Sequence, residues 1–366
     1  MSNVKSVSKT RQIEMQFSVL RTAMAILISL AIAFVLIATV SENAGRDFIT
    51  LLIGPLKSAS RLTTIISKFI PLLFTGTAIC LVNSAGQTNI AAEGAFFAGA
   101  VASTAVAIIP GIPAVIHIPL CMAAGAVGGA IIMGIPGLLY VRYDVVTIVA
   151  SLMINYVALY LGLYIILNPL RDPAAGFEAS YRFAESTILP VLFGNPRIHI
   201  GLVFGILAVI FGYLLLYHTS FGISARTIGE NQKFAVYSGM PVGKTIVGIS
   251  LVAGCISGIG GTLETLGNYQ RFMYGGLTNH GWDGVMLAVL CHNKPQYMPL
   301  AALFLAYIRT SADALNFSSS IPPEIISIIQ AVIIILVAAE RFLAKWEHRA
   351  IVKNTKREMK TQGGAN

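Results

Sequence analysis

Long uninterrupted apolar runs are the dominant pattern along this chain. Residues 20–40 carry a single charge, Arg21, near one edge, and residues 246–263 carry none. About 20 apolar residues span the hydrocarbon core of a bilayer when they form a helix. The pattern therefore predicts an all-α polytopic membrane protein, with spans at about 20–40, 65–83, 90–109, 116–135, 145–167, 198–217, 246–266, 283–292, 297–315 and 325–343.

The eighth of these ten runs, 283–292, is too short to cross a bilayer unaided. It starts at Asp283, and the stretch before it is rich in glycine. An interrupted helix is tolerated at membrane depth where it lines a cavity. We therefore expect a broken or partly re-entrant helix at this position.

A short polar signature occurs twice, at the start of two apolar runs. Residues 88–98 read Thr-Asn-x-x-x-Glu-Gly-x-x-x-Ala, and residues 278–288, placed 190 positions later, read Thr-Asn-x-x-x-Asp-Gly-x-x-x-Ala. Internal repeats in an apolar chain are typical of transporters built from two homologous halves. We therefore expect two related halves, each with a carboxylate where a helix enters the membrane.

The distribution of charged residues indicates how the chain is oriented in the membrane. Charged residues make up only 11% of the chain, where a soluble domain has about a quarter. With both termini in the cytoplasm, sixteen of the 25 Lys and Arg residues fall on the cytoplasmic side, as the positive-inside rule requires. This predicts a cytoplasmic N-terminus at 1–19, a transmembrane domain at 20–345 and a basic cytoplasmic tail at 346–366 in a cell-membrane protein. The two signatures then start at opposite faces, which is an inverted repeat.

The sequence offers little support for an enzyme. The four cysteines have no paired spacing, and the six histidines form no metal-binding motif. Residues 238–245 approach the phosphate-loop pattern, but Ser238 stands where its first glycine belongs, and no soluble α/β domain surrounds it. We therefore expect no catalytic site, no metal and no ATPase site in this chain.

The polar stretch at 219–244 is the expected cytoplasmic loop between the sixth and seventh spans. Its pattern predicts two short helices with a break near Gly229. Asn231 is suited to cap the second helix, and Gly239 to end it. Phe234, Ala235 and Ser238 would form a narrow face for a partner. The alternative is an ordinary polar loop between spans.

The loop resembles the coupling-helix region of permeases of ATP-binding-cassette (ABC) importers, in the ribose-type and branched-chain amino acid-type superfamily. Residues 89–94 are similar to the Asn-Ile-Gly-x-Glu-Gly signature of the nucleoside branch, although Ala91 replaces the glycine and Ala95 stands where glutamine is common. Residues 281–285 and 321–331 resemble two further segments, so that the resemblance covers residues 20–345. The residues it assigns to ATPase coupling are Arg226, Gly229, Glu230, Asn231, Ala235 and Gly239.

The resemblance implies the fold of a type II ABC importer and a division of labour. A pair of permeases, identical or sister chains, forms the pathway, and two cytoplasmic ATPase subunits bind and hydrolyse ATP. An extracellular binding lipoprotein delivers the solute to the outer loop at 168–197. This chain binds no cofactor itself. The nucleoside branch favours a nucleoside as the solute and a sister chain as the second permease.

Polar residues within apolar spans are the candidates for the solute pathway. An ionisable group at membrane depth is costly and normally faces a cavity or a partner. Amides could bind the hydroxyl groups of a sugar, and an aromatic ring could stack on a base. The alternative for each residue is a structural hydrogen bond between helices. The candidates are Asn89, Glu93, Asn155, Asn279, Trp282 and Asp283.

Two other functions stay open at this point. The same architecture could import simple sugars such as ribose. From a different class, an ion-coupled secondary transporter would also have inverted repeats and membrane carboxylates. In that case, however, the loops at 219–244 and 168–197 would have no assigned role.

Overall fold

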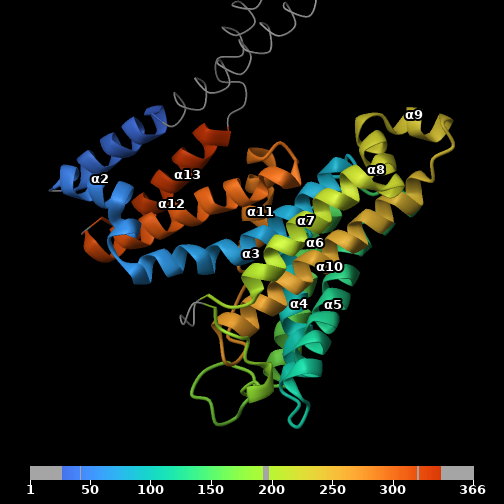
Figure 1. Cartoon of the computed structure of the whole chain (residues 1–366), viewed down its shortest axis with the longest axis horizontal. Coiled ribbons are helices and arrows are strands. Elements are labelled where there is room, and N and C mark those ends of the chain that lie inside the picture. The colour runs from blue at the N-terminus through green and yellow to red at the C-terminus, as the bar shows by residue number, and fades with distance from the viewer. Residues whose placement is uncertain (1–26, 42, 193–197, 320, 339–366) are drawn as a thin grey trace, which may run out of the picture. The chain divides into compact units, whose positions relative to one another are not determined.

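The computed structural model describes residues 27–41, 43–192, 198–319 and 321–338 (Figure 1). Apart from two isolated β-bridges and short 3-10 turns, the regular structure of these residues is α-helical. The described residues divide into two compact units, one of residues 56–310 and one of the described residues before 56 and after 310. The expected segments 1–19 and 346–366 lie outside the described residues.

The smaller unit contains both ends of the described chain. Its helices are Leu27–Val40, α2 (Ala44–Ile53), the last part of α12 (Met298–Ser318) and α13 (Pro323–Ala338). The connection between the first two is held to α2 by the Ser41 hydroxyl, which donates to Oδ2 of Asp47 at 2.6 Å. The rings of Phe34 and Phe48 also pack edge to face, with centroids 5.2 Å apart.

The larger unit is a bundle that holds both copies of the repeated signature. Five described helices are long and apolar enough to cross a membrane: α3, α5, α6, α7 and α10. Every run expected between residues 65 and 315 overlaps a helix. The elements are α3 (Ala59–Ser84), α4 (Ala92–Ala107), α5 (Ala114–Tyr143), α6 (Thr147–Leu167), η2 (Glu185–Thr187), α7 (Gly201–His218), α8 (Ser220–Glu230), α9 (Gln232–Tyr237), α10 (Val242–Asn268), α11 (His280–Leu290), η3 (Pro295–Tyr297) and the first part of α12.

The two connecting segments expected to be functional lie at opposite ends of this unit. Helices α8 and α9 stand at one end, and the segment between α6 and α7 loops around the other (Figure 1). That segment is fixed to the bundle through its backbone. Ala184 donates to the carbonyl of Ala107 at the end of α4, and Phe183 donates to the carbonyl of Gln270 beyond α10.

Glycines bring α4, α5 and α10 into backbone contact at the centre of the larger unit. A methyl group on Gly258 of α10 would overlap the carbonyl oxygen of Gly125 on α5, and one on Gly99 of α4 would overlap the carbonyl of Gly258. Gly129 and Gly254 meet in the same way. Inside a membrane, burial from water adds little to helix association, so small residues that permit close packing hold helices together.

We expect Gly258→Val to disrupt this three-helix contact. The added side chain would have to displace the backbone of α5, and overpacking of this kind costs about 1–3 kcal/mol or more. The measurement is the folded yield and the thermal unfolding midpoint in detergent. The matched control is Gly176→Val, because nothing lies within 4 Å of a side chain added there. Equal midpoints for the two variants would contradict the prediction.

Candidate functional site

Glu93, from the first copy of the signature, holds the start of the second copy. Its Oε1 accepts hydrogen bonds from the backbone N–H of Asn279 at 2.7 Å and from the Thr278 hydroxyl at 3.3 Å. Its Oε2 accepts from the backbone N–H of Gly281. The Glu93 side chain is fully buried. The two copies, far apart in sequence, therefore meet through one carboxylate. The expectation that they start at opposite faces of the membrane is wrong, because their starts are in direct contact.

The start of α11 needs hydrogen-bond acceptors from outside the helix. The first N–H groups of a helix have no acceptor within the helix. Asn279, the residue before α11, adopts a left-handed conformation with φ of 63° and its side chain makes no cap. Glu93 supplies the missing acceptors, and its negative charge suits the positive end of the helix dipole. Gly281 is required here, since a methyl group would overlap the backbone of Glu93.

Asn155 of α6 likewise binds backbone groups at the start of α4. Its Oδ1 accepts from the backbone N–H of Gly94 at 2.8 Å, and its Nδ2 donates to the carbonyl of Ile90 at 3.1 Å. Asn89 donates to the carbonyl of Met133 at 3.0 Å and accepts from the N–H of Ala91. Both asparagines are buried. Both side chains therefore make structural hydrogen bonds within the protein, which is the alternative to a role in binding the solute.

Asp283 forms an ion pair with Arg309 of α12 through its Oδ1. The Asp283 side chain is almost fully buried, and its Oδ2 has no hydrogen-bond partner among the described residues. Arg309 was not among the candidates. Sequence spacing instead suggests Asp313, four residues later in the same run, as the partner of Arg309. The structure pairs Arg309 with Asp283, which only helix packing brings close.

The remaining two pathway candidates are exposed. Asn279 and Trp282 lie three residues apart at the start of α11, and Met286 continues the same face one turn later. Trp282 retains 39% of its accessible surface. The six candidates therefore separate into two groups. Asn89, Glu93, Asn155 and Asp283 fix helices in place, whereas an amide and an indole ring remain accessible.

The segment expected to couple to an ATPase forms two helices, as predicted. The break falls at Asn231, between α8 and α9, two residues beyond Gly229. The expected cap is confirmed, since Oδ1 of Asn231 accepts from the N–H of Phe234 at 3.0 Å. Gly239 follows α9 with φ of 75°, the left-handed conformation that commonly ends a helix.

The individual coupling candidates have different environments. Arg226 fastens α8 to the end of α7, where its Nε donates to the carbonyl of Leu216 at 3.1 Å and its guanidinium lies 4.7 Å from the centre of the Tyr217 ring. Ala235 is fully buried in a cluster with Ile228. The expected exposed face therefore does not include Ala235, because the underside of α9 packs on the bundle. The outer side of α9 exposes Phe234, Val236 and Tyr237, and Glu230 is exposed at the end of α8.

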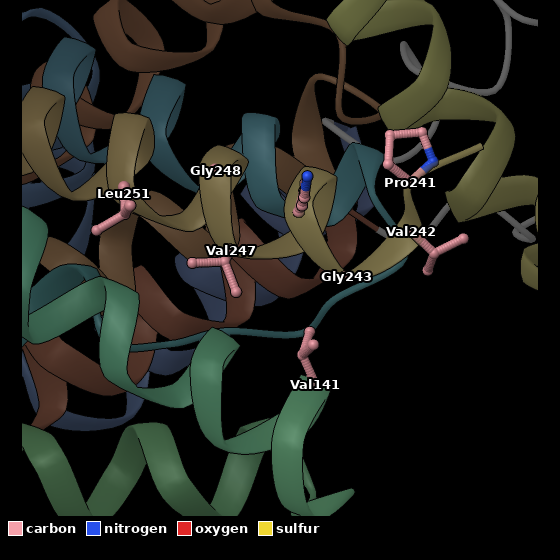
Figure 2. Close-up of a pocket in the computed structure, with 8 residues that line it drawn as sticks. Val141, Pro241, Val242, Gly243, Val247, Gly248 and Leu251 are labelled. Atoms are coloured by element: carbon pink, nitrogen blue, oxygen red, sulfur yellow. The ribbon is translucent and has the colours of Figure 1, made fainter.

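An open groove of about 660 Å³ lies beside this segment, between the end of α5 and the start of α10 (Figure 2). Its surface is almost entirely apolar, with Lys244 as its one charged residue. This composition does not suit a polar solute, which needs several hydrogen-bonding groups. The lining residues are Val141, Pro241, Val242, Gly243, Lys244, Val247, Gly248 and Leu251.

We expect Glu93→Gln to loosen the start of α11. Glutamine keeps one acceptor oxygen but turns an amide donor toward a backbone N–H, so that a charge-assisted bond worth about 1.5–3 kcal/mol is lost. The measurement is hydrogen exchange of residues 279–284 in nanodiscs, which should accelerate about tenfold or more. Glu178→Gln, at an exposed position, is the control. Unchanged exchange would show that Glu93 does not hold α11.

We expect Arg309→Met to reduce the folded yield strongly. The change leaves the buried Asp283 carboxylate without its partner, which costs about 3–5 kcal/mol. The double variant Asp283→Asn with Arg309→Met should recover much of the yield, because it removes the uncompensated charge. Thermal unfolding in detergent measures the coupling between the two positions. Additive effects of the two single changes would argue against a direct pair.

The chain is similar to several transport permeases along most of its length. It is 31% identical to the guanosine ABC transporter permease protein NupP of Bacillus subtilis, over 75% of this chain and 80% of that protein. It is 28% identical to the glucose ABC transporter permease protein TsgB13 of Haloferax volcanii, over 88% of this chain and 87% of that one. The nucleoside ABC transporter permease protein NupB of Lactococcus lactis is 27% identical, over 79% and 82%.

A family model described as the branched-chain amino acid transport system / permease component matches residues 61–338. This range includes both copies of the signature and helices α8 and α9. The match agrees with the resemblance drawn from the sequence motifs, and it covers most of the chain. The protein is therefore a membrane protein that belongs to this family of transport-system permease components.

Proposed function

We propose that this chain is the transmembrane permease subunit of an ABC importer that moves nucleosides into the cell. The observation that carries the proposal is the similarity to permeases named for guanosine and for nucleosides, over 75% and 79% of this chain. The exposed amide of Asn279 and the ring of Trp282 suit a nucleoside, since one can bind sugar hydroxyls and the other can stack on a base.

A sugar importer is the second candidate. The relative named for glucose covers 88% of this chain, more than either nucleoside permease does. A sugar could use the same amide, and a pyranose ring can also pack on an indole. Family membership, by contrast, argues against the third interpretation, an ion-coupled secondary transporter.

The proposed architecture has about ten spans in two inverted repeats, with both termini in the cytoplasm. The repeated signature supports two related halves, and the distribution of Lys and Arg supports cytoplasmic termini. The position of α8 and α9 at the opposite end of the unit from the α6–α7 segment agrees with it (Figure 1). In this arrangement residues 219–244 face the cytoplasm and residues 168–197 face outward.

The proposed partners follow from these two ends. Two cytoplasmic ATPase subunits bind beneath the pair of permeases and contact this chain at α8 and α9, where Phe234 and Tyr237 are exposed, the latter to 90%. A substrate-binding lipoprotein meets the α6–α7 segment. A second permease, which we propose to be a sister chain, completes the pathway. ATP is bound and hydrolysed by the ATPase subunits, and this chain contributes the passage and the surfaces that respond to them.

Uptake of labelled guanosine by cells with and without this chain tests the proposal. We expect deletion of the chain to abolish uptake, and excess ribose not to compete with guanosine in cells that carry it. ATP depletion with the proton gradient intact should also stop uptake, because the energy comes from ATP. Unchanged guanosine uptake after deletion, with loss of glucose or ribose uptake, would replace the nucleoside by a sugar.

A further inference from the structure

The connection between α3 and α4, residues 85–91, lies directly against α8. A methyl group on Gly229 of α8 would overlap the carbonyl oxygen of Ser84, and one on Gly86 would come within 3.0 Å of the Gly229 Cα. Gly86 itself has φ of 71°, a conformation that favours glycine. The two backbones therefore touch without any side chain between them, so a displacement of α8 is passed directly to this connection.

The same connection is also held by hydrogen bonds to the start of α6. The Thr147 hydroxyl, on the first residue of α6, donates to Oε1 of Gln87 at 2.8 Å. One turn later, the Ser151 hydroxyl accepts from the backbone N–H of Ile90 at 3.1 Å. All of these groups are buried. An unsatisfied polar group in this place is costly, so the hydrogen bonds keep the connection in one position.

Shortly after this connection comes Glu93, whose carboxylate holds the start of α11. Glu93 is the second residue of α4 and accepts hydrogen bonds from the backbone of Asn279 and Gly281. The route from Gly229 to the start of α11 therefore contains packed backbone, buried hydrogen bonds and one carboxylate. Closely packed interiors of this kind transmit small displacements rather than absorb them.

We infer that Gln87, Thr147 and Ser151 are positioning residues that transmit movement of α8 to the exposed face of α11. They hold residues 85–91 as a stiff link, and Gly86 and Gly229 are its contact with the coupling helices. This inference rests on the proposed function and adds to it the residues by which ATPase movement reaches the solute pathway. Without the ties to α6, movement of α8 would be absorbed in the connection.

The test uses the whole importer, with its ATPase subunits and binding protein, in proteoliposomes. The variants are Thr147→Val, which removes the hydroxyl, and Thr147→Ser, which keeps it. Thr104→Val is the matched control, because Thr104 is equally buried and its hydroxyl bonds only within α4, to the carbonyl of Ala100. The measured quantity is the amount of solute imported per ATP hydrolysed.

We expect Thr147→Val to lower this ratio at least about fivefold, the change that corresponds to about 1 kcal/mol for a lost buried hydrogen bond. ATP hydrolysis itself should continue, since the ATPase sites lie on other subunits. Thr147→Ser and Thr104→Val should keep the ratio of the unmodified protein. A purely structural role would instead lower import and hydrolysis together, through loss of assembled complex.

Ser151→Ala keeps the inference falsifiable if Thr147→Val fails to fold. It removes one hydroxyl and adds no bulk, and it should lower the ratio in the same direction. An unchanged ratio in either folded variant, or an equal fall in Thr104→Val, would overturn the inference. Import of a sugar in place of a nucleoside would contradict the proposed solute alone, and the same ratio measured with that sugar would still test the link.

Discussion

The capping of α11 by Glu93 is the interaction on which the candidate site depends. A helix that begins inside an apolar bundle has backbone N–H groups that water cannot reach, and each unsatisfied group is expensive at membrane depth. Glu93 supplies acceptors to two of them and a charge that suits the end of the helix. The short helix is possible because this carboxylate comes from another element.

The glycine contacts among α4, α5 and α10 place Glu93 where α11 needs it. Gly99 and Gly258 bring α4 and α10 to backbone distance, and Gly125 does the same for α5. At that distance there is little freedom for α4 to rotate or slide. Asn155 then fixes the first turn of α4 through Gly94 and Ile90. The carboxylate is thus held by packing and by hydrogen bonds at the same time.

Some polar residues of the candidate site bind other parts of the protein, and others remain accessible. Side chains with the strongest hydrogen-bonding capacity, Glu93 and Asp283, are used internally, against a helix start and against Arg309. The surface left accessible at the start of α11 is formed by Asn279 and Trp282.

Local properties of this protein could be predicted from its sequence. Runs of about 20 apolar residues identified the five described helices that are long and apolar enough to cross a membrane. Asn231 and Gly239 marked the limits of α9, because hydropathy and capping involve only neighbouring residues. The repeated signature singled out Glu93 and Asp283 as candidate residues of the solute pathway. Only the tertiary structure decided which groups they bind: the N–H groups of α11 and the guanidinium of Arg309. It also decided that Ala235 is buried and that Gly229 meets Gly86. The physical reason is that these contacts join residues distant along the chain, whose proximity is set by helix packing.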